Sequence, residues 1–531
     1  MIKFFCLFIS IFFLVSFQLH SYTLDDIICL LEAGKFQEVE EFIKEIRDEN
    51  KKIFINSIYY LYLGDYEKAY NFLNSLQTNN TSEYKPEEKF FFHYIPYIYH
   101  LFKEEYKRYE SQHFVVFLKG RDEILKDIIL ENLEKIYVFY NEKFNYYPKE
   151  KIRVEVYDKK KEFCNASTLP EEVVKKAGVV GICKFNRIMI LSPENLPYGY
   201  RWIDTLAHEY VHFLLNRITE YKYPLYLHEA TAKYFDTLYR STQPLCFSIG
   251  NLKELLDAKR NNRLIPFENL KGSLVYLDSQ QEVELAFIEL ASFLEYIINN
   301  FGENKFIKFV HNYINYKDEK LLYRDIFNKE YTELIKNWIE SIEEKKELVE
   351  KYPGALMDIK ILNLEDEKEL LTLESSQYIE LGDMLLRKKQ YKAALYQYKK
   401  SQQQQPYNPI VMTRISKVLM LLKDYKNAEE ILKQCIMINP NFSTAYELIV
   451  ELYYETSQYH KALEYYKELL QINPFNYKIR KIIAEIYSDL GKLKEALYEY
   501  KIVSILNPED KNVVSIIDTI NRYLETKQQT K

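Results

Sequence analysis

The sequence predicts a mixed α+β domain flanked on both sides by all-α helical repeats, and three observations support this fold class. Short runs of β-branched and aromatic residues lie between residues 113 and 191. An apolar helical pattern at residues 200–215 carries two histidines spaced by four. The last third of the chain repeats with a period of 34 residues.

The first residues have the composition of a secretory signal. Lys3 precedes a nearly uninterrupted apolar run at residues 4–17, and Ser21 follows as a small residue. The run is shorter than the roughly 20 residues that a transmembrane helix needs. We therefore expect residues 1–21 to be a signal peptide and the protein to be exported to the periplasm or the extracellular space. The alternative is an uncleaved N-terminal segment that anchors the protein to a membrane.

The composition is that of a helix-rich globular protein, with 47% hydrophobic residues, 12 glycines and 15 prolines. The net charge is −6, and acids and bases are interspersed without a basic face, so we expect no nucleic-acid partner. The cysteines are too few and too scattered for a disulfide framework. Cys164 with Cys183 is the one pair that we would test for a disulfide bond.

Residues 22–109 are interpreted as a helical, weakly repeat-like region. Two glycines, Gly34 and Gly64, lie 30 residues apart, each in a turn between a leucine and an aromatic residue. Residues 110–341 are the predicted α+β domain. Strands are predicted at 113–118, 152–157, 178–183 and 187–191, and helices at 122–144, 282–299 and 305–313.

The histidine pair predicts a metal site. His208 and His212 are four residues apart, which places both imidazoles on one face of a helix, one turn apart. Glu229 on the following helix can supply a third ligand, and Glu209 can lie beside a metal-bound water. This set is typical of one catalytic Zn²⁺ with an open position. The alternative is a core helix whose histidines only form hydrogen bonds, which is disfavoured because buried polar groups need partners.

Residues 111–315 resemble the peptidase-MA-like gluzincins, a group of zinc metallopeptidases. The resemblance is carried by the motif helix and by the stretches 111–117, 151–157, 187–193, 227–235 and 291–297. It implies a zincin-like metallopeptidase fold for residues 110–341, with a mixed sheet and active-site helices. It also implies that His208, His212 and Glu229 are zinc ligands, that Glu209 is the general base, and that the activity is endopeptidase.

The chain departs from this pattern at two places. Ala230 follows the third ligand where the family often has glycine, and Phe287 stands where relatives often have tyrosine. Phe287 lacks the hydroxyl that supports the transition state in such relatives, and Tyr276 or His228 are the candidates to replace it. Asp236 is a candidate partner for a ligand histidine, or else a solvated or capping residue.

In similar enzymes an edge strand before the motif helix aligns the substrate backbone by strand addition. We assign this role to the strand at 187–191. Its residues are Arg187, Ile188, Met189, Ile190 and Leu191.

The C-terminal part resembles tetratricopeptide repeats. Four such repeats are predicted over 375–510, a capping helix and tail at 511–531, and a charged linker at 342–374. The small alanines let paired helices approach closely, and the prolines end the second helix of each pair. The repeating columns are Pro406, Pro440, Pro474 and Pro508, and Ala394, Ala428, Ala462 and Ala496. We expect the concave surface to bind a peptide or protein partner, with a rigid spacer as the alternative.

Two functions follow. The first is an exported zinc-dependent endopeptidase that hydrolyses peptide bonds through a metal-activated water, with the repeats recruiting the substrate or a partner protein. The alternative is a catalytically weak or inactive peptidase-like protein that acts as a repeat scaffold in the cell envelope. The intact set of His208, Glu209, His212 and Glu229 favours the first function, and Phe287 favours the second.

Overall fold

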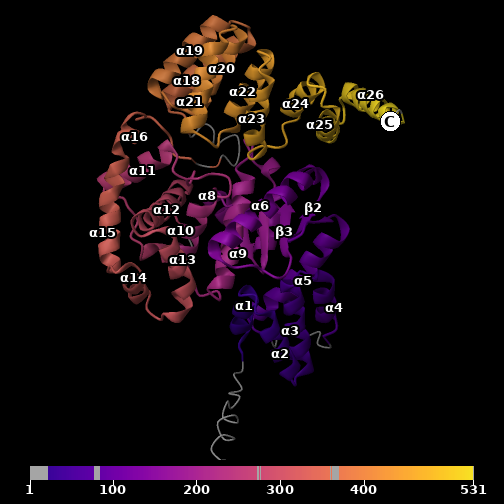
Figure 1. Ribbon diagram of the computed structural model, residues 1–531, viewed down its shortest axis with the longest axis vertical. Coiled ribbons are helices and arrows are strands. Elements are labelled where there is room, and N and C mark those ends of the chain that lie inside the picture. Colours follow the sequence, from indigo (N-terminus) through magenta and orange to yellow (C-terminus); the bar gives the residue numbers. More distant parts are fainter. Residues whose placement is uncertain are drawn as a thin grey trace, which may run out of the picture.

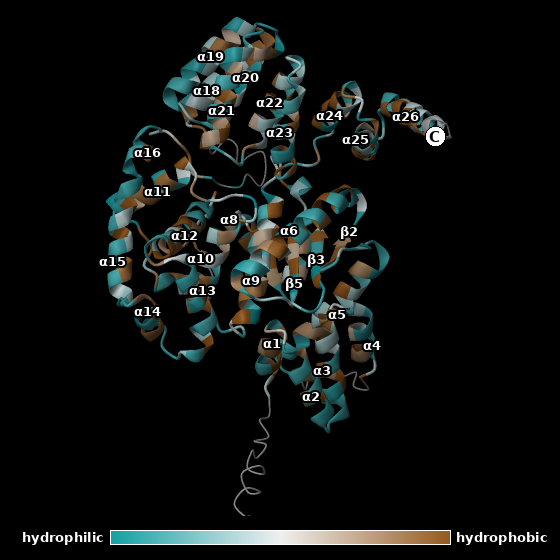
Figure 2. Ribbon diagram, viewed as in Figure 1, coloured by the Kyte–Doolittle hydropathy of each residue, from teal (hydrophilic) through white to brown (hydrophobic). Residues whose placement is uncertain are grey.

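The computed structural model describes residues 22–76, 84–271, 274, 277–358, 360 and 370–529. The predicted signal peptide at 1–21 and the candidate residue Tyr276 lie outside the described residues. A central sheet is bordered below by the N-terminal helices, on one side by the helices α10 to α16, and above by an arch of helix pairs (Figure 1). Apolar residues are concentrated on the facing sides of these elements (Figure 2).

The N-terminal region consists of two helical hairpins and one longer helix. Gly34 and Gly64 form the two hairpin turns, with φ of +75° and +77°, a left-handed conformation that glycine adopts without steric cost. The helices are α1 (Leu24–Glu32), α2 (Phe36–Glu45), α3 (Glu49–Tyr62), α4 (Tyr66–Asn74) and α5 (Pro86–Glu104).

The sheet is mixed, as predicted, and has five strands in the order β1-β2-β3-β5-β4. The inner three strands run parallel, and each edge strand is antiparallel to its neighbour. The strands are β1 (Lys107–Glu110), β2 (Phe114–Leu118), β3 (Ile152–Tyr157), β4 (Gly181–Lys184) and β5 (Arg187–Leu191).

The assignment of Arg187–Leu191 as the substrate-aligning edge strand is wrong. This segment is β5, which pairs with β3 on one side and with β4 on the other, so its backbone groups are already hydrogen-bonded. All five of its side chains are buried. The open edge of the sheet next to the motif helix is β4, because β4 pairs with β5 on the side opposite to β3.

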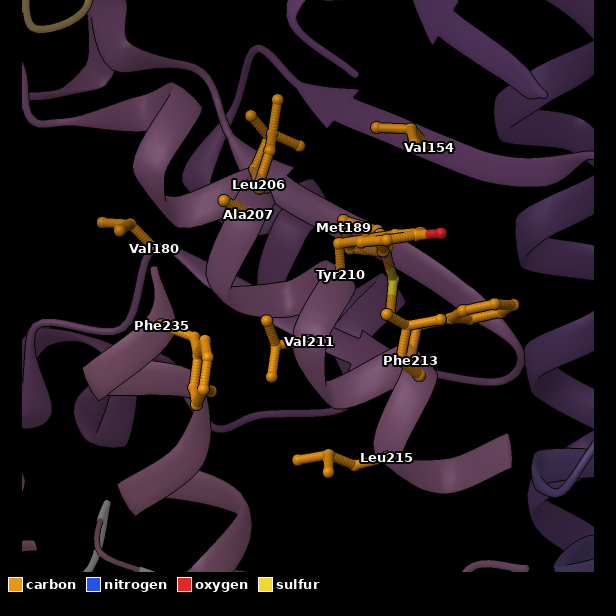
Figure 3. Packing of buried hydrophobic residues seen from close by; sticks show 14 of the residues in the cluster. Val154, Val180, Met189, Leu206, Ala207, Tyr210, Val211, Phe213, Leu215 and Phe235 are labelled. Atoms are coloured by element: carbon orange, nitrogen blue, oxygen red, sulfur yellow. The ribbon is translucent and has the colours of Figure 1, made fainter. Parts of the chain in front are cut away.

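Two helices cover one face of the sheet. The metal-motif helix α9 (Trp202–Ile218) and the crossover helix α6 (Lys126–Phe144) pack on one face. Figure 3 shows this core, in which Leu206 and Tyr210 of α9 meet Met189 of the sheet. The other crossover elements are η2 (Gly120–Leu125), α7 (Lys160–Ser167), α8 (Glu171–Ala177) and η3 (Pro193–Asn195).

A buried charge pair joins the sheet to the N-terminal helices. Glu155 of β3 lies 3.1 Å from the Nε atom of Arg187, and the Tyr157 hydroxyl donates to Glu155 at 2.5 Å. Arg187 also donates to the hydroxyl of Tyr94 at 2.5 Å, and Tyr66 donates to Glu155. Arg187 therefore has a structural role, since it neutralises a fully buried carboxylate.

A helical layer follows the motif helix and includes both helices predicted at 282–299 and 305–313. Part of the predicted linker also packs here, because Ile342, Val349 and Ala355 are buried. The elements are α10 (Leu225–Phe235), α11 (Ile249–Arg260), η4 (Asn269–Lys271), α12 (Gln280–Phe301), α13 (Glu303–Asn312), η6 (Tyr313–Asn315), α14 (Glu319–Phe327), α15 (Tyr331–Ser341), η7 (Ile342–Lys345) and α16 (Lys346–Glu350).

The C-terminal arch contains the four predicted helix pairs and a final helix. The repeating alanines, such as Ala428 and Ala462, are fully buried. The helices are α18 (Leu373–Arg387), α19 (Tyr391–Gln404), α20 (Pro409–Leu421), α21 (Tyr425–Ile438), α22 (Ser443–Glu455), α23 (Tyr459–Leu470), α24 (Tyr477–Asp489), α25 (Leu493–Leu506) and α26 (Lys511–Gln529). In the part of the chain that the structure describes, no helix combines the length and apolar character needed to cross a membrane.

Candidate metal centre and its cleft

The two histidines and the third carboxylate meet at one point. His208 Nε2 lies 3.1 Å from His212 Nε2, and these atoms lie 3.3 and 3.4 Å from Glu229 Oε2. A tetrahedral zinc ion with bonds of about 2.0–2.1 Å needs ligand atoms about 3.3 Å apart. The three donor atoms therefore match the spacing of three zinc ligands without rearrangement. Among the described residues, this is the one group of at least three His, Cys, Asp or Glu close enough to share an ion.

The charges of this group also suit a cation. Burial lowers the pKa of His208 to about 4, so its imidazole is neutral at pH 7. Burial acts in the same direction on His212, but Glu229 outweighs it and raises the pKa of His212. Burial would raise the pKa of Glu229, yet His212 and His208 hold that pKa well below its usual range. The donor set is thus an ionised carboxylate between two imidazoles, which is a typical zinc environment.

Glu209 lies between the metal group and the edge strand β4. A Cβ atom at Gly181 would be 2.8 Å from Glu209 Oε1 and 2.6 Å from Thr205 Cγ2, so only glycine leaves room for the carboxylate. The backbone of Cys183 forms a hydrogen bond with Glu209. Burial, reinforced by the charge of Glu229, raises the pKa of Glu209 to about 8. Gly181 was not among the residues expected at the site, although a glycine inside a strand signals a close approach of another group.

His228 lies behind one ligand. Its Nδ1 atom is 3.3 Å from Nδ1 of His212, the nitrogen that does not face the other donors. Burial lowers the pKa of His228 to about 3, so the ring is neutral and its unprotonated nitrogen can accept a hydrogen bond from Nδ1–H of His212. This position favours a role for His228 in orienting the imidazole of His212 over a role in replacing the missing tyrosine hydroxyl.

The other candidates lie further from the donor atoms. Asp236 caps α10, and its Oδ2 atom is 3.7 Å from Lys233 Nζ, so its charged partner is a lysine and not a ligand histidine. Phe287 places its ring edge-on to His208, with centroids 6.2 Å apart. Cys164 and Cys183 are both free, so the structure does not contain this disulfide bond.

The metal group opens into a cavity of about 740 Å³. One wall is the edge strand β4, and a second comes from residues 356–358 and Lys360, which follow α16. The third wall was not foreseen from the sequence, because it belongs to the C-terminal arch. Its residues are Pro409, Asn439, Pro440, Asn441 and Phe442.

The arch is docked directly onto the start of the motif helix. The backbone N–H groups of Tyr200 and Trp202 donate to the carbonyls of Ile472 and Gln471 at 3.0 and 3.2 Å. The indole Nε1 of Trp202 donates to the carbonyl of Leu470 at 2.8 Å. The bond from the backbone of Trp202 satisfies a donor at the first turn of α9, which otherwise lacks a partner inside the helix.

Comparisons with known proteins identify the C-terminal arch. The sequence model of the tetratricopeptide repeat matches residues 411–442 and 443–476, which confirms the predicted repeats. Repeats of this type support a role in protein–protein interaction, because their stacked helices form an extended concave surface. No curated protein matches the chain.

Two solved structures illustrate the similarity. A fragment of MamA from Desulfovibrio magneticus RS-1 is 16% identical, covers 30% of this chain and 90% of its own, and has a TM-score of 0.27. YrrB, described as a tetratricopeptide repeat protein with an unusual peptide-binding site, is 17% identical, covers 30% of this chain and 81% of its own, and has a TM-score of 0.25.

Proposed function

We propose that this protein is an exported zinc-dependent endopeptidase with a zincin-like catalytic domain. The observation that carries this proposal is the spacing of 3.1–3.4 Å among the donor atoms of His208, His212 and Glu229, with Glu209 beside them. Export to the periplasm or the extracellular space rests on residues 1–21, and this segment would anchor the protein to a membrane if it is not cleaved.

The chain supplies the groups that peptide hydrolysis needs. Zinc bound to His208, His212 and Glu229 would polarise the peptide carbonyl and lower the pKa of a bound water toward about 7. Glu209, whose ionised form the positive charge of a bound zinc would favour, accepts the proton of the attacking water at its carboxylate as the new C–O bond forms. It then donates that proton to the departing amine as the C–N bond breaks. Its buried position beside β4 keeps the carboxylate close to the reacting groups.

The edge strand β4 can align the substrate. Val180 accepts a hydrogen bond from Leu191, and in an antiparallel ladder alternate residues bond to the same neighbour. Ile182 therefore pairs with β5, while the backbone groups of Gly181 and Cys183 point to the open edge, where the backbone of Cys183 also bonds to Glu209. An extended peptide that pairs there lies next to Glu209, as strand addition requires.

Comparison of the wild type with Glu209→Gln tests the catalytic role. Both proteins, produced as residues 22–531, are loaded with zinc and incubated with casein, an unfolded protein. We expect equal zinc content and loss of proteolysis in Glu209→Gln, since the amide cannot accept the proton. Equal proteolysis by both proteins contradicts the role of Glu209, and zinc binding without proteolysis in the wild type contradicts the endopeptidase activity.

A scaffold in the cell envelope is the second candidate, favoured by the tetratricopeptide repeat match and by Phe287. In this case the repeats bind a peptide or protein partner and the α+β domain only positions them. The scaffold function predicts that partner binding, measured by pull-down and mass spectrometry, is unchanged in Glu229→Ala. Loss of every partner together with loss of zinc contradicts it.

A further inference from the structure

The turn between α21 and α22 reaches into the cleft of the metal centre. This segment, Asn439–Phe442, is called the repeat turn below. It lines the same cavity as His208, Glu209 and β4, although it belongs to the tetratricopeptide repeats. Asn441 is exposed within this turn and faces the cavity without an apolar cover.

Arg201 fixes the repeat turn in this position. Its guanidinium donates to the carbonyl of Pro440 at 2.9 Å, to Asn441 Oδ1 at 3.3 Å and to Glu468 at 2.8 Å. A fourth hydrogen bond of the same side chain reaches the Tyr446 hydroxyl at 3.1 Å. Arg201 directly precedes α9, so one side chain joins the repeat turn to the helix that carries His208.

The backbone around Arg201 is adapted to this contact. Gly199 has φ of +67°, and a Cβ atom there would lie 2.2 Å from the carbonyl oxygen of Ile472. Only glycine allows such an approach of two backbones. Tyr198 packs against Phe442 with ring centroids 5.1 Å apart and ring planes tilted by 31°, and both rings line the cavity. The segment before α9 and the C-terminal arch therefore have residues suited to close contact at the cleft.

The wall formed by residues 356–358 and Lys360 restricts access to the cavity further. The backbone N–H of Asp358 donates to Asn251 Oδ1 at 2.9 Å, and Gln280 donates to the carbonyl of Lys360 at 3.2 Å. These bonds hold the segment before the repeats against α11 and α12. A cavity of about 740 Å³ enclosed in this way has the size of a pocket for a short ligand. A single extended chain fits such a space, and a folded domain does not.

We propose that the repeat turn is a substrate-binding wall of the catalytic cleft, so that the enzyme acts on one extended, unfolded polypeptide segment held between β4 and Asn441. This inference rests on the proposed peptidase function and adds the substrate class and the role of the repeats. The repeats act inside the cleft, in addition to any partner that binds their concave surface.

The test introduces bulk into the repeat turn. Asn441→Trp fills the space opposite β4, and Glu509→Trp is the matched control, since it is the exposed residue at the same turn position two repeats later. With labelled casein, we expect KM to rise about tenfold in Asn441→Trp, with zinc content and kcat unchanged, because uniform substrate binding is lost. Glu509→Trp should behave as the wild type.

A second measurement does not depend on turnover. In Glu209→Gln loaded with zinc, casein should slow amide hydrogen exchange in β4 and in the repeat turn together. The additional change Arg201→Ala should remove the protection of the repeat turn and keep that of β4. Protection of β4 alone, with an unchanged KM in Asn441→Trp, overturns the inference while leaving the peptidase function intact. Absence of bound zinc overturns the peptidase function and this inference with it.

Discussion

His208 and His212 direct their Nε2 atoms to positions 3.1 Å apart, although their backbones are one helical turn from each other. Glu229 from the neighbouring helix α10 places one oxygen at nearly the same distance from both. Such convergence of three metal-ligating atoms in a partly buried site is favourable when a cation lies between them. This geometry is the basis for the predictions below.

Gly181→Ala should impair catalysis without loss of zinc. The new methyl group overlaps Thr205 and Glu209, which must move. We expect about a hundredfold lower kcat, since small displacements of a reacting group have effects of this size. Overpacking should also lower the free energy of unfolding by about 1–3 kcal/mol. Proteolysis and urea denaturation measure these effects, and Cys183→Ala, which keeps the backbone bond to Glu209, is the control. Full activity in Gly181→Ala contradicts the placement of Glu209.

His228→Ala should weaken zinc binding. Loss of the group beside His212 Nδ1 leaves that ligand free to rotate, and changes of this kind lower metal affinity about 10–100-fold. Competition with a chelator of known affinity measures the effect. His311, which bonds to the carbonyl of Phe144 at 2.7 Å, provides the control variant His311→Ala. Equal zinc affinity of His228→Ala and His311→Ala would show that His228 does not orient His212.

Arg187→Met should destabilise the fold. The change leaves Glu155 buried with only Arg153 as a counter-charge, so we expect a loss of unfolding free energy at or below the about 3–5 kcal/mol that an unpaired buried charge costs. The double variant Glu155→Gln with Arg187→Met should recover part of this loss, as measured by urea denaturation. A fully stable Arg187→Met protein that no longer binds substrate would instead restore the substrate-aligning role for this residue.

The stability of the protein should depend on the ionisation of Asp122 between about pH 4 and 7. Burial raises the pKa of Asp122 from 3.8 to about 7, so the folded state retains a proton that the unfolded state releases. Stability contributed by this group therefore falls as pH rises from about 4 to 7. Asp122→Asn should reduce that fall by about 1–3 kcal/mol, and urea midpoints at pH 5 and pH 8 measure it. The exposed Asp518→Asn serves as control, and an identical pH dependence in both variants contradicts the prediction.

Local patterns in the sequence were sufficient to predict the helices that carry the metal-ligating residues and the helix pairs of the arch. The period of 34 gave the helix pairs of the arch, because each repeat buries the same columns. The spacing of His208 and His212 gave one helical face, and Glu229 followed from the next helix. In each case the signal lies within one or two consecutive elements.

The order of strands and the docking of the arch were not accessible in this way. The segment Arg187–Leu191 was predicted as one strand of a hairpin, but the order of strands in the sheet depends on which side of the hairpin pairs with β3. The contact between Arg201 and Pro440 joins residues 239 apart in the chain. A local sequence pattern does not indicate a contact between residues so far apart in the chain. Gly199 is the one neighbouring residue whose type is consistent with this close approach.

Zinc content of the purified chain tests the central claim most directly. Residues 22–531 and the variant Glu229→Ala are dialysed against trace zinc and measured by elemental mass spectrometry, with circular dichroism to confirm folding. The account predicts one zinc ion per wild-type chain and its loss in Glu229→Ala, since three protein ligands are required. A folded wild-type chain that binds no zinc, or a Glu229→Ala variant that binds it equally well, would contradict the account.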